Sequence, residues 1–184
     1  MYNCSNQLRA FVSLRTTTAD HTCCFTKRQL VSPKDVLPGL SQLATYNYLN
    51  VVPHWSTCGT ENWDEVESRV RQLVKSLNMT IEVWTRSSQT LKATGATTKY
   101  LSDQYNEQPI SPYIWKVLYN FENDEALAII QINKPGLKLA DAVKYVPCKD
   151  ICNRIEWMRN PNWYIMSKGF IICCSLEDFQ TAFG

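Results

Sequence analysis

The most regular pattern of apolar and polar residues lies between residues 63 and 77. Apolar side chains recur there at spacings of three and four, at Trp63, Val66, Val70, Val74 and Leu77. This period places them on one stripe of a helix, which predicts an α-helix over 63–77 with one buried face. Asn62 is the expected N-cap. The first turns also carry acids, which the positive end of the helix dipole favours, at Asp64, Glu65 and Glu67.

Shorter patterns on either side of this helix predict strands. Residues 45–52 are rich in aromatic and β-branched types, so we expect an extended segment that ends at Pro53. Residues 80–85 alternate like a strand. Residues 111–121 and 125–133 flank a polar turn and predict a β-hairpin.

The last third of the chain mixes both kinds of element. Short helices are expected over 137–145 and from about 149 to 158. Residues 168–176 predict a last strand, and residues 177–182 predict a terminal turn with acidic residues at its start. Strands and helices without regular βαβ alternation predict an α+β fold.

The composition is that of an ordinary globular domain. The 184 residues fit a single domain, and 45% apolar with 20% charged residues excludes a disordered chain. The net charge of +2 is small, so any basic patch must be local. No apolar run approaches the roughly 18 residues that a membrane span needs, and the first residues lack the apolar core of a signal peptide. We expect a secreted protein whose leader has been removed, or a fragment.

Eight cysteines favour an oxidising compartment. Two adjacent pairs, Cys23 with Cys24 and Cys173 with Cys174, and the lack of a CxxC spacing argue against a zinc module. Up to four disulfides are expected, each adjacent cysteine reaching a distant partner. The 148–152 region should be tied to Cys173 and Cys174 or to the N-terminal pair. Glycosylation sequons at Asn3 and Asn78 also fit secretion.

A dense motif precedes and enters the predicted helix. It comprises Lys27-Arg28-Gln29-Leu30, Pro33, Asp35, Ala44-Thr45-Tyr46, Asn50, Pro53-His54-Trp55, Gly59, Asn62-Trp63, Val66-Glu67 and Val70-Arg71. Farther along stand Pro112-Tyr113-Ile114-Trp115-Lys116-Val117, Ile132-Asn133-Lys134-Pro135 and Lys168-Gly169-Phe170. In this order the residues resemble the DNA/RNA non-specific endonuclease family (ββα-metal nucleases), and within it the secreted arthropod double-stranded ribonuclease-like branch.

This resemblance covers roughly residues 25 to 180. It implies a central, mostly antiparallel sheet flanked by helices, with the 63–77 helix packed beside residues 26–35. The family places a substantial segment ahead of the histidine motif, whereas 28 residues precede Gln29 here. We therefore expect a single nuclease-like domain over 1–184 that lacks part of the family's N-terminal region.

The resemblance also implies a chemistry that these residues support in part. The family hydrolyses phosphodiesters with a histidine base and a magnesium ion held by an asparagine. Gln29 stands at the base position, and the family's metal positions correspond to Asn50, Gly59 and Glu67. An amide takes no proton from water near neutral pH, and glycine offers no side-chain oxygen. No intact catalytic set is expected among Gln29, Asn50, Glu67 and Arg71. We also expect that the protein binds neither a metal nor another cofactor.

The basic residues near this motif are the expected nucleic-acid-binding residues, namely Lys27, Arg28, Lys34 and Arg71. Lys27 stands where the family has an arginine, so it keeps the charge but lacks the planar fork. Structural explanations compete with the functional ones. Glu67 and Arg71, four residues apart, could form a simple surface pair, and Asp35 could cap a turn.

Other residues of the motif region have weaker functional interpretations. Asn50 could serve as a structural hydrogen-bonding residue, and His21 as an ordinary loop histidine. His54 replaces a family glutamine and is a less favoured substitute base. The tryptophans are expected in the core rather than as base-stacking platforms, at Trp55, Trp63, Trp84, Trp115, Trp157 and Trp163.

Three functions of different classes remain open. The leading hypothesis is a secreted, catalytically degenerate nuclease-fold protein that binds nucleic acid or another protein, with no membrane partner. The first alternative is an active magnesium-dependent endonuclease with a variant site, which would need a new base and a new metal ligand together. The second is a structural or assembly protein that could form oligomers.

Overall fold

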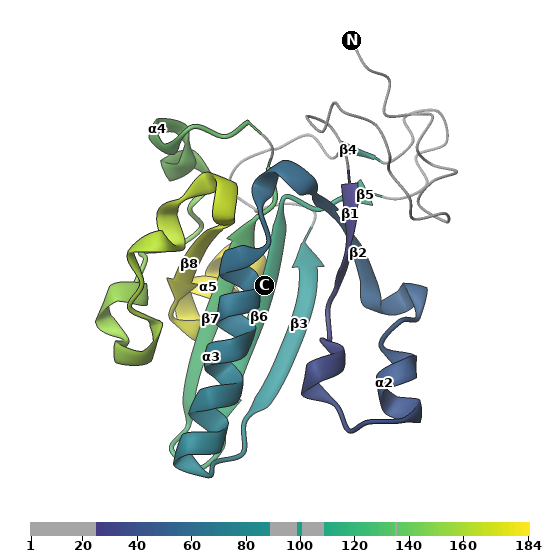
Figure 1. Cartoon of the computed structure of the whole chain (residues 1–184). Helices are drawn as coiled ribbons and strands as arrows, with labels where there is room; N and C mark the ends of the chain where they lie inside the picture. Colours follow the sequence, from purple (N-terminus) through teal and green to yellow (C-terminus); the bar gives the residue numbers. More distant parts are fainter. Residues whose placement is uncertain (1–24, 89–98, 101–108, 135) are drawn as a thin grey trace.

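A four-stranded antiparallel sheet forms the centre of the structure (Figure 1). The computed structural model describes residues 25–88, 99–100, 109–134 and 136–184. The sheet has the order β3 (Glu82–Ser88), β6 (Tyr113–Asn120), β7 (Glu125–Ile132) and β8 (Phe170–Cys174). The expected hairpin is confirmed as β6 and β7, which pair from Tyr113 opposite Ile132 to Asn120 opposite Glu125. The α+β class with an antiparallel sheet is therefore confirmed.

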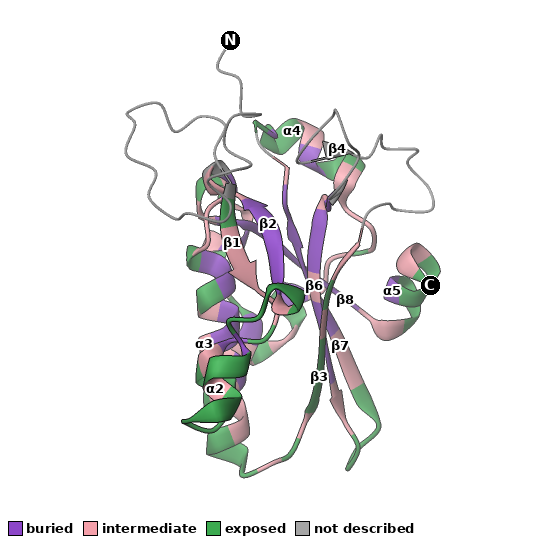
Figure 2. Cartoon of the chain, turned by 90° about the vertical axis from the view of Figure 1, so that its right-hand side faces the viewer, coloured by how far each residue is buried: buried purple, intermediate pink, exposed green. Residues whose placement is uncertain are grey.

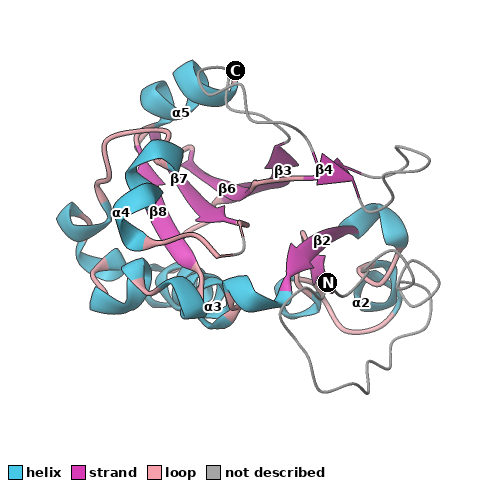
Figure 3. Ribbon diagram, turned by 90° about the horizontal axis from the view of Figure 1, so that it is seen from above, coloured by secondary structure: helices cyan, strands magenta, loops and turns pink. Residues whose placement is uncertain are grey.

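Two helices cover opposite faces of this sheet (Figure 3). Alternate side chains of each strand point to opposite faces. One face packs against α3 (Glu61–Leu77) through Ile114, Leu118, Ile129, Ile171 and Cys173. The other packs against α5 (Leu176–Phe183) through Tyr113, Val117, Ala128, Ile130 and Ile172. Most of β6, β7 and β8 is buried, whereas the edge strand β3 is mostly exposed (Figure 2).

The long helix confirms the predicted apolar stripe, because Trp63, Val66 and Val70 are buried against the sheet. Its start differs from the prediction. The helix begins at Glu61, and Thr60 occupies the N-cap without a side-chain cap hydrogen bond. The Asn62 side chain is buried and donates from Nδ2 to the Asn162 and Gly169 carbonyl oxygens, at 2.7 Å each. Asn62 is thus a tie to a distant segment rather than the N-cap.

A separate two-stranded ribbon lies beside the sheet and α3 (Figure 1). It consists of β1 (Phe25–Gln29) and β2 (Val51–Trp55). The strand expected over 45–52 is wrong at its start, because Tyr48–Asn50 forms a 3-10 turn, η3, and the strand continues through Pro53. Pro53 is tolerated there because a two-stranded ribbon has an open edge. A second small ribbon pairs β4 (Lys99–Tyr100) with β5 (Pro109–Ile110).

The β1–β2 connection projects from the body of the structure. It contains the 3-10 turn η2 (Pro33–Asp35) and the helix α2 (Leu40–Ala44). Most of α2 is exposed to solvent (Figure 2). We call residues 36–50 the α2 arm.

Short turns replace one of the predicted helices in the last third of the chain. The helix expected over 137–145 is confirmed as α4 (Leu139–Ala142) and the 3-10 turn η5 (Val143–Tyr145). The helix expected over 149–158 is wrong, since it is split into η6 (Cys152–Arg154) and η7 (Glu156–Met158). Two further 3-10 turns follow, η8 (Pro161–Tyr164) and η9 (Met166–Lys168). The terminal turn is a full helix, α5, whose N-cap Ser175 accepts from the Asp178 N–H at 3.1 Å.

Two disulfides explain why residues 149–158 do not form one helix. Cys148 is bonded to Cys174 and Cys152 to Cys173, which confirms the expected tie to the last strand. Asp150 adds to this tie, because its Oδ1 accepts from the backbone N–H of both Cys152 and Cys173. These bonds fix the segment against β8 rather than along a helix axis.

The remaining cysteines are accounted for differently. Cys58 is free and buried, so the eight cysteines do not form all four of the disulfides that their number allows. Cys4, Cys23, Cys24 and His21 lie outside the described residues.

Most tryptophans occupy the core, as predicted. Trp63 and Trp163 are fully buried, and Trp55, Trp115 and Trp157 are partly buried. Trp84 differs, with 46% exposure on the edge strand β3. Among the described residues, no helix is long and apolar enough to cross a membrane.

Candidate functional site

A basic cavity of about 300 Å³ lies between β1, η2 and α3. It is lined by Lys27, Arg28, Gln29, Ser32, Pro33, Lys34, Asp64, Glu67 and Arg71. We call this cavity the basic pocket, because four basic side chains face two carboxylates. All four residues expected to bind nucleic acid line it, together with Gln29 and Glu67. The predicted packing of the long helix beside residues 26–35 is confirmed by the Arg28–Asp64 ion pair at 2.9 Å.

Gln29 is held at the edge of the basic pocket by its own amide. Its Nε2 donates to the Thr45 carbonyl oxygen at 2.9 Å, and the Thr45 hydroxyl lies 3.4 Å away. The same carbonyl oxygen accepts from Asn50 Nδ2 at 2.7 Å. The structure therefore brings Gln29 and Asn50 together through one backbone oxygen, although Asn50 does not line the pocket.

Asn50 ties the last residue of the α2 arm to the segment that precedes the arm. Its Oδ1 accepts from the Val31 N–H at 2.8 Å, and its Nδ2 donates to the Val31 carbonyl oxygen at 2.9 Å. Gln42 adds a third amide contact, from Nε2 to the Pro33 carbonyl oxygen at 3.1 Å. Both ends of the Asn50 amide are thus satisfied by backbone, which agrees with the structural explanation for this residue.

Glu67 forms a buried ion pair with a residue from another element. Its Oε1 lies 3.5 Å from Lys116 Nζ, and the two side chains are 8% and 3% exposed. Lys116 Nζ also donates to the Leu30 carbonyl oxygen and to Thr85 Oγ1, at 3.0 Å each. Burial lowers the pKa of Lys116, and the Glu67 carboxylate opposes that shift. The alternative of a surface pair between Glu67 and Arg71 is therefore wrong.

Arg71 reaches from α3 to η2 instead. Its Nη1 donates to Asp35 Oδ1 at 2.6 Å, so Asp35 is an ion-pair partner rather than a turn cap. The turn cap is Ser32, whose Oγ accepts from the Lys34 N–H. Arg28 lies against the Trp63 ring, with its guanidinium carbon 5.9 Å from the ring centroid. Lys27 Nζ lies 5.0 Å from the centroid of the Tyr48 ring.

Gly59 lies apart from this cluster. It follows the 3-10 turn η4 (Ser56–Cys58) with a φ of +67°, and it packs against residues 167–169. A Cβ at this position would overlap the Ser167 carbonyl oxygen and lie 2.6 Å from the Lys168 carbonyl carbon. The Gly59 carbonyl oxygen accepts from Gln131 Nε2 at 3.0 Å. Any side chain here would have to displace backbone, so the family's asparagine does not fit this packing.

The residues at the family's metal positions do not fit a magnesium ion in this arrangement. Magnesium prefers oxygen ligands in near-octahedral geometry. The Glu67 carboxylate is paired with the Lys116 ammonium, the Asn50 oxygen accepts from backbone, and Gly59 has no side chain. A magnesium ion would therefore have to compete with Lys116 for Glu67, and it would find no side-chain oxygen at Gly59.

His54 is enclosed in the ribbon rather than open to the basic pocket. It is fully buried on β2, and burial together with the nearby Arg28 charge lowers its pKa to about 4. A base must reach the water that it deprotonates. The buried imidazole cannot do so, which argues against His54 as a substitute base.

Sequence reasoning missed Lys116 and Thr45 as site residues. Lys116 occupies the α3 side of β6, where its neighbours Ile114 and Leu118 are apolar. A lysine flanked by apolar residues two positions away on each side is the signal that could have found it, because such a charge needs a buried partner. Thr45 acts through its backbone oxygen, which no side-chain motif reveals.

Of the two expected glycosylation sites, Asn3 lies outside the described residues. Asn78 is exposed at the C-cap of α3, in a left-handed conformation with φ of 47°. This position leaves the sequon accessible, and its modification stays a prediction.

Comparison with known proteins confirms the resemblance drawn from the motif. A model of the family described as DNA/RNA non-specific endonuclease matches residues 31–179. The chain is 30% identical to the salivary endonuclease of Lutzomyia longipalpis over 161 residues, which cover 84% of this chain and 38% of that protein.

Two further relatives come from Glossina morsitans morsitans. Salivary protein Tsal2A is 25% identical over 156 residues, and salivary protein Tsal1 is 27% identical over 159 residues. These matches cover 84% and 85% of this chain and 39% of each relative. The chain thus spans about two fifths of the length of these curated relatives. No solved structure matches the chain.

Proposed function

Since the chain belongs to the DNA/RNA non-specific endonuclease family, we propose that it binds nucleic acid in the basic pocket without hydrolysing it. The observation that carries this proposal is the gathering of Lys27, Arg28, Lys34 and Arg71 around one cavity beside Gln29. Neutralisation of phosphates by lysine and arginine supplies most of the affinity of such binding. Lys34 is exposed on η2 and is well placed to meet a phosphate from solvent.

The chemistry of the pocket supports binding over hydrolysis. The amide of Gln29 donates to Thr45 and has no basic lone pair that could deprotonate water. Glu67 is engaged by Lys116, and the metal positions do not fit magnesium. Hydrolysis by this family's route needs both a base and a metal-stabilised leaving group.

We also propose that the protein acts outside the cell. The relatives named above are salivary proteins, and two disulfides join the last strand to the preceding loop. Disulfides persist in oxidising compartments. Detection of the protein with intact disulfides in a secreted fluid is the expected result, and its confinement to the reducing cytosol would contradict this.

A salt-dependent binding titration tests the binding half of the proposal. Full-length protein is titrated with duplex RNA, duplex DNA and single strands at several salt concentrations. The logarithm of the binding constant should fall linearly with that of the salt concentration. Lys34→Ala should reduce the slope by about 1, because one phosphate contact is lost. Lys144→Ala is the matched control, since Lys144 is 75% exposed on η5 and does not line the basic pocket.

Binding that does not depend on salt, or the absence of binding to any nucleic acid, would overturn this proposal. A well-folded oligomer without nucleic-acid affinity would instead favour the structural or assembly role.

A nuclease assay tests the other half. With added magnesium, cleavage of RNA and DNA should not exceed the background seen with chelator. Loss of a general base alone removes about 10²–10⁴ in rate. Chelator-sensitive cleavage that disappears in Glu67→Ala would show that the chain is a variant enzyme.

A further inference from the structure

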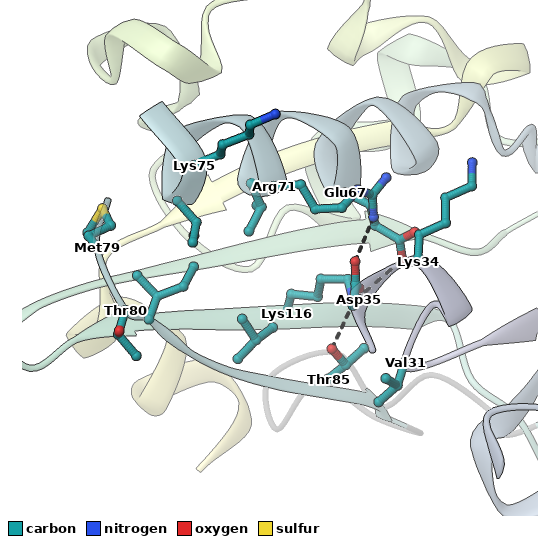
Figure 4. Close-up of a pocket in the computed structure, with 14 residues that line it drawn as sticks. Val31, Lys34, Asp35, Glu67, Arg71, Lys75, Met79, Thr80, Thr85 and Lys116 are labelled. Atoms are coloured by element: carbon teal, nitrogen blue, oxygen red, sulfur yellow. Dashed lines mark hydrogen bonds and ion pairs between the residues drawn. The ribbon is translucent and has the colours of Figure 1, made fainter. Parts of the chain in front are cut away.

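A second cavity of about 550 Å³ adjoins the basic pocket. It lies between α3 and the strands β3 and β6 (Figure 4). Its apolar lining comes from Val70 and Val74 of α3, Met79 and Ile81 of the following loop, and Val83 of β3. We call it the apolar side pocket. Lys34, Glu67 and Arg71 line both cavities, so the two adjoin and these side chains lie between them.

The apolar side pocket is polar at the end that meets the basic pocket. There, Arg71 reaches across to Asp35, and Lys116 lies between Glu67 and Thr85 (Figure 4). Lys34 and Lys75 add positive charge to the lining. A ligand that spans both cavities would therefore meet cations first and a mainly apolar surface beyond them.

We propose that the apolar side pocket takes one unpaired nucleobase of a strand whose phosphate lies in the basic pocket. This inference rests on the proposed function, because it assumes that the phosphate is bound beside Lys34 and Arg71. The cavity volume lies within the range of about 300–1,000 Å³ that is typical of small-ligand sites. Valine and isoleucine side chains suit the flat faces of a base, and a thioether such as that of Met79 makes favourable contacts with aromatic rings.

The choice of a single strand over a duplex follows from the proposed occupant. A paired base within a duplex stays stacked between its neighbours and cannot enter a side cavity without leaving the helix. Single-stranded RNA or DNA pays no unpairing cost. The charge at the boundary favours an anion joined to an apolar ring over an uncharged ligand. The proposed ligand is therefore a single strand, with one base in the apolar side pocket.

Three labelled probes separate base binding from phosphate binding. They are a short oligouridylate, a duplex of equal length, and an abasic phosphodiester strand that keeps the charges but carries no bases. The 184-residue chain should bind the oligouridylate about tenfold more tightly than the abasic strand, the low end of what stacking on aromatic rings contributes, because the lining here is aliphatic. The duplex should resemble the abasic strand.

A cavity-filling variant tests the location. Val74→Phe places a ring in the apolar side pocket and should reduce oligouridylate affinity to the abasic level, while affinity for the abasic strand stays unchanged. Leu73→Phe is the matched control, because Leu73 adjoins it on α3 but lines a different cavity. Val83→Trp, made on the exposed strand β3, fills the same pocket from the other side if Val74→Phe does not fold.

Each contrary outcome has a distinct meaning. Equal affinity for the oligouridylate and the abasic strand would overturn the base pocket and leave the proposed function standing. A similar loss in Leu73→Phe and Val74→Phe would also overturn it. If none of the three probes binds in a salt-dependent manner, the proposed function itself fails. Dodecanoate serves as a fourth probe: if it binds the unmodified chain but not Val74→Phe, and the bases do not affect affinity, the pocket takes an acyl chain and the base pocket is overturned.

Discussion

The motif has an open end around the basic pocket and a packed end at the start of α3. At the open end, Glu67 and Arg71 line the basic pocket and form ion pairs with Lys116 and Asp35, respectively. The beginning of the helix is packed without space, since Gly59 meets the backbone of residues 167–169 and Asn62 is bonded to two carbonyl oxygens. A departure from the family pattern therefore has a different meaning at each end.

At the open end, a departure changes the chemistry of a pocket and leaves the fold intact. Gln29 is such a case, because its amide sits at the pocket edge with hydrogen bonds to Thr45 alone among the bonds described for it. At the packed end, a departure from the family pattern is required by the packing of the fold. The backbone of Ser167 and Lys168 leaves no room for a side chain at Gly59, so restoring the family's asparagine there would have to displace that backbone.

The largest expected effect would break the packed end. Gly59→Asn should cost about 5 kcal/mol or more of unfolding free energy, since overlap with backbone cannot be relieved by a rotamer change. Denaturant unfolding measures it. Gly136→Asn is the control, because Gly136 has a similar φ of +66° with nothing near its Cβ position. Equal, small costs at both positions would show that the backbone facing Gly59 yields.

The next effect concerns the buried ion pair at the open end. Lys116→Met leaves the Glu67 carboxylate buried without its cation, which should cost about 3–4 kcal/mol. Lys144→Met removes an exposed partner of Asp141 and should cost less than about 0.5 kcal/mol. Comparable losses in the two variants, measured by denaturant unfolding, would mean that solvent screens the Glu67–Lys116 pair.

A smaller effect should appear as a pH dependence. His54 has a pKa of about 4 in the folded chain against an ordinary value of 6.5. Between these values the unfolded chain binds a proton that the folded chain does not, so this contribution is present above pH 6.5 and lost as pH falls to 4. The loss should reach about 3 kcal/mol. His54→Gln should lack it, and identical pH profiles for both proteins would contradict the buried neutral state.

The smallest expected effect is at Gln29. Gln29→His should cost about 1 kcal/mol through the lost bond to Thr45. It should not create magnesium-dependent cleavage, because Lys116 still occupies Glu67 and Gly59 still lacks a ligand atom. Gln42→His, which removes an amide of the α2 arm away from the pocket, controls for loss of the arm contacts. Cleavage by Gln29→His alone would show that the metal positions are functional.

The structure also changes the value of the paired substitution. Gln29→His combined with Gly59→Asn would rebuild both family residues, but the second change should unfold the protein before the first can act. The absence of cleavage by that double variant would therefore say nothing about catalysis.

The parts of the structure that sequence could predict are those set by local pattern. The stripe on α3 and the β6–β7 hairpin follow from the spacing of apolar residues, and the motif order placed Gln29, Glu67 and Arg71 around one cavity. The parts that it could not predict depend on distant segments. Asn62 looks like a cap in sequence but is bonded to residues 100 and 107 positions away. Lys116 interrupts the apolar pattern of β6, and its partner Glu67 lies on a different element, α3.

The two disulfides also determine how firmly the segment that faces Gly59 is held. Residues 167–169, which face Gly59, lie within the loop between Cys152 and Cys173, and that segment consists of 3-10 turns rather than longer helices. The first bridge to form destabilises the unfolded chain by about 3 kcal/mol, and the second adds less because the two loops are nested. Until both bridges form, residues 167–169, which pack against the start of α3, are weakly anchored. Reduced chains would therefore hold the first turn of α3 less firmly than oxidised chains do.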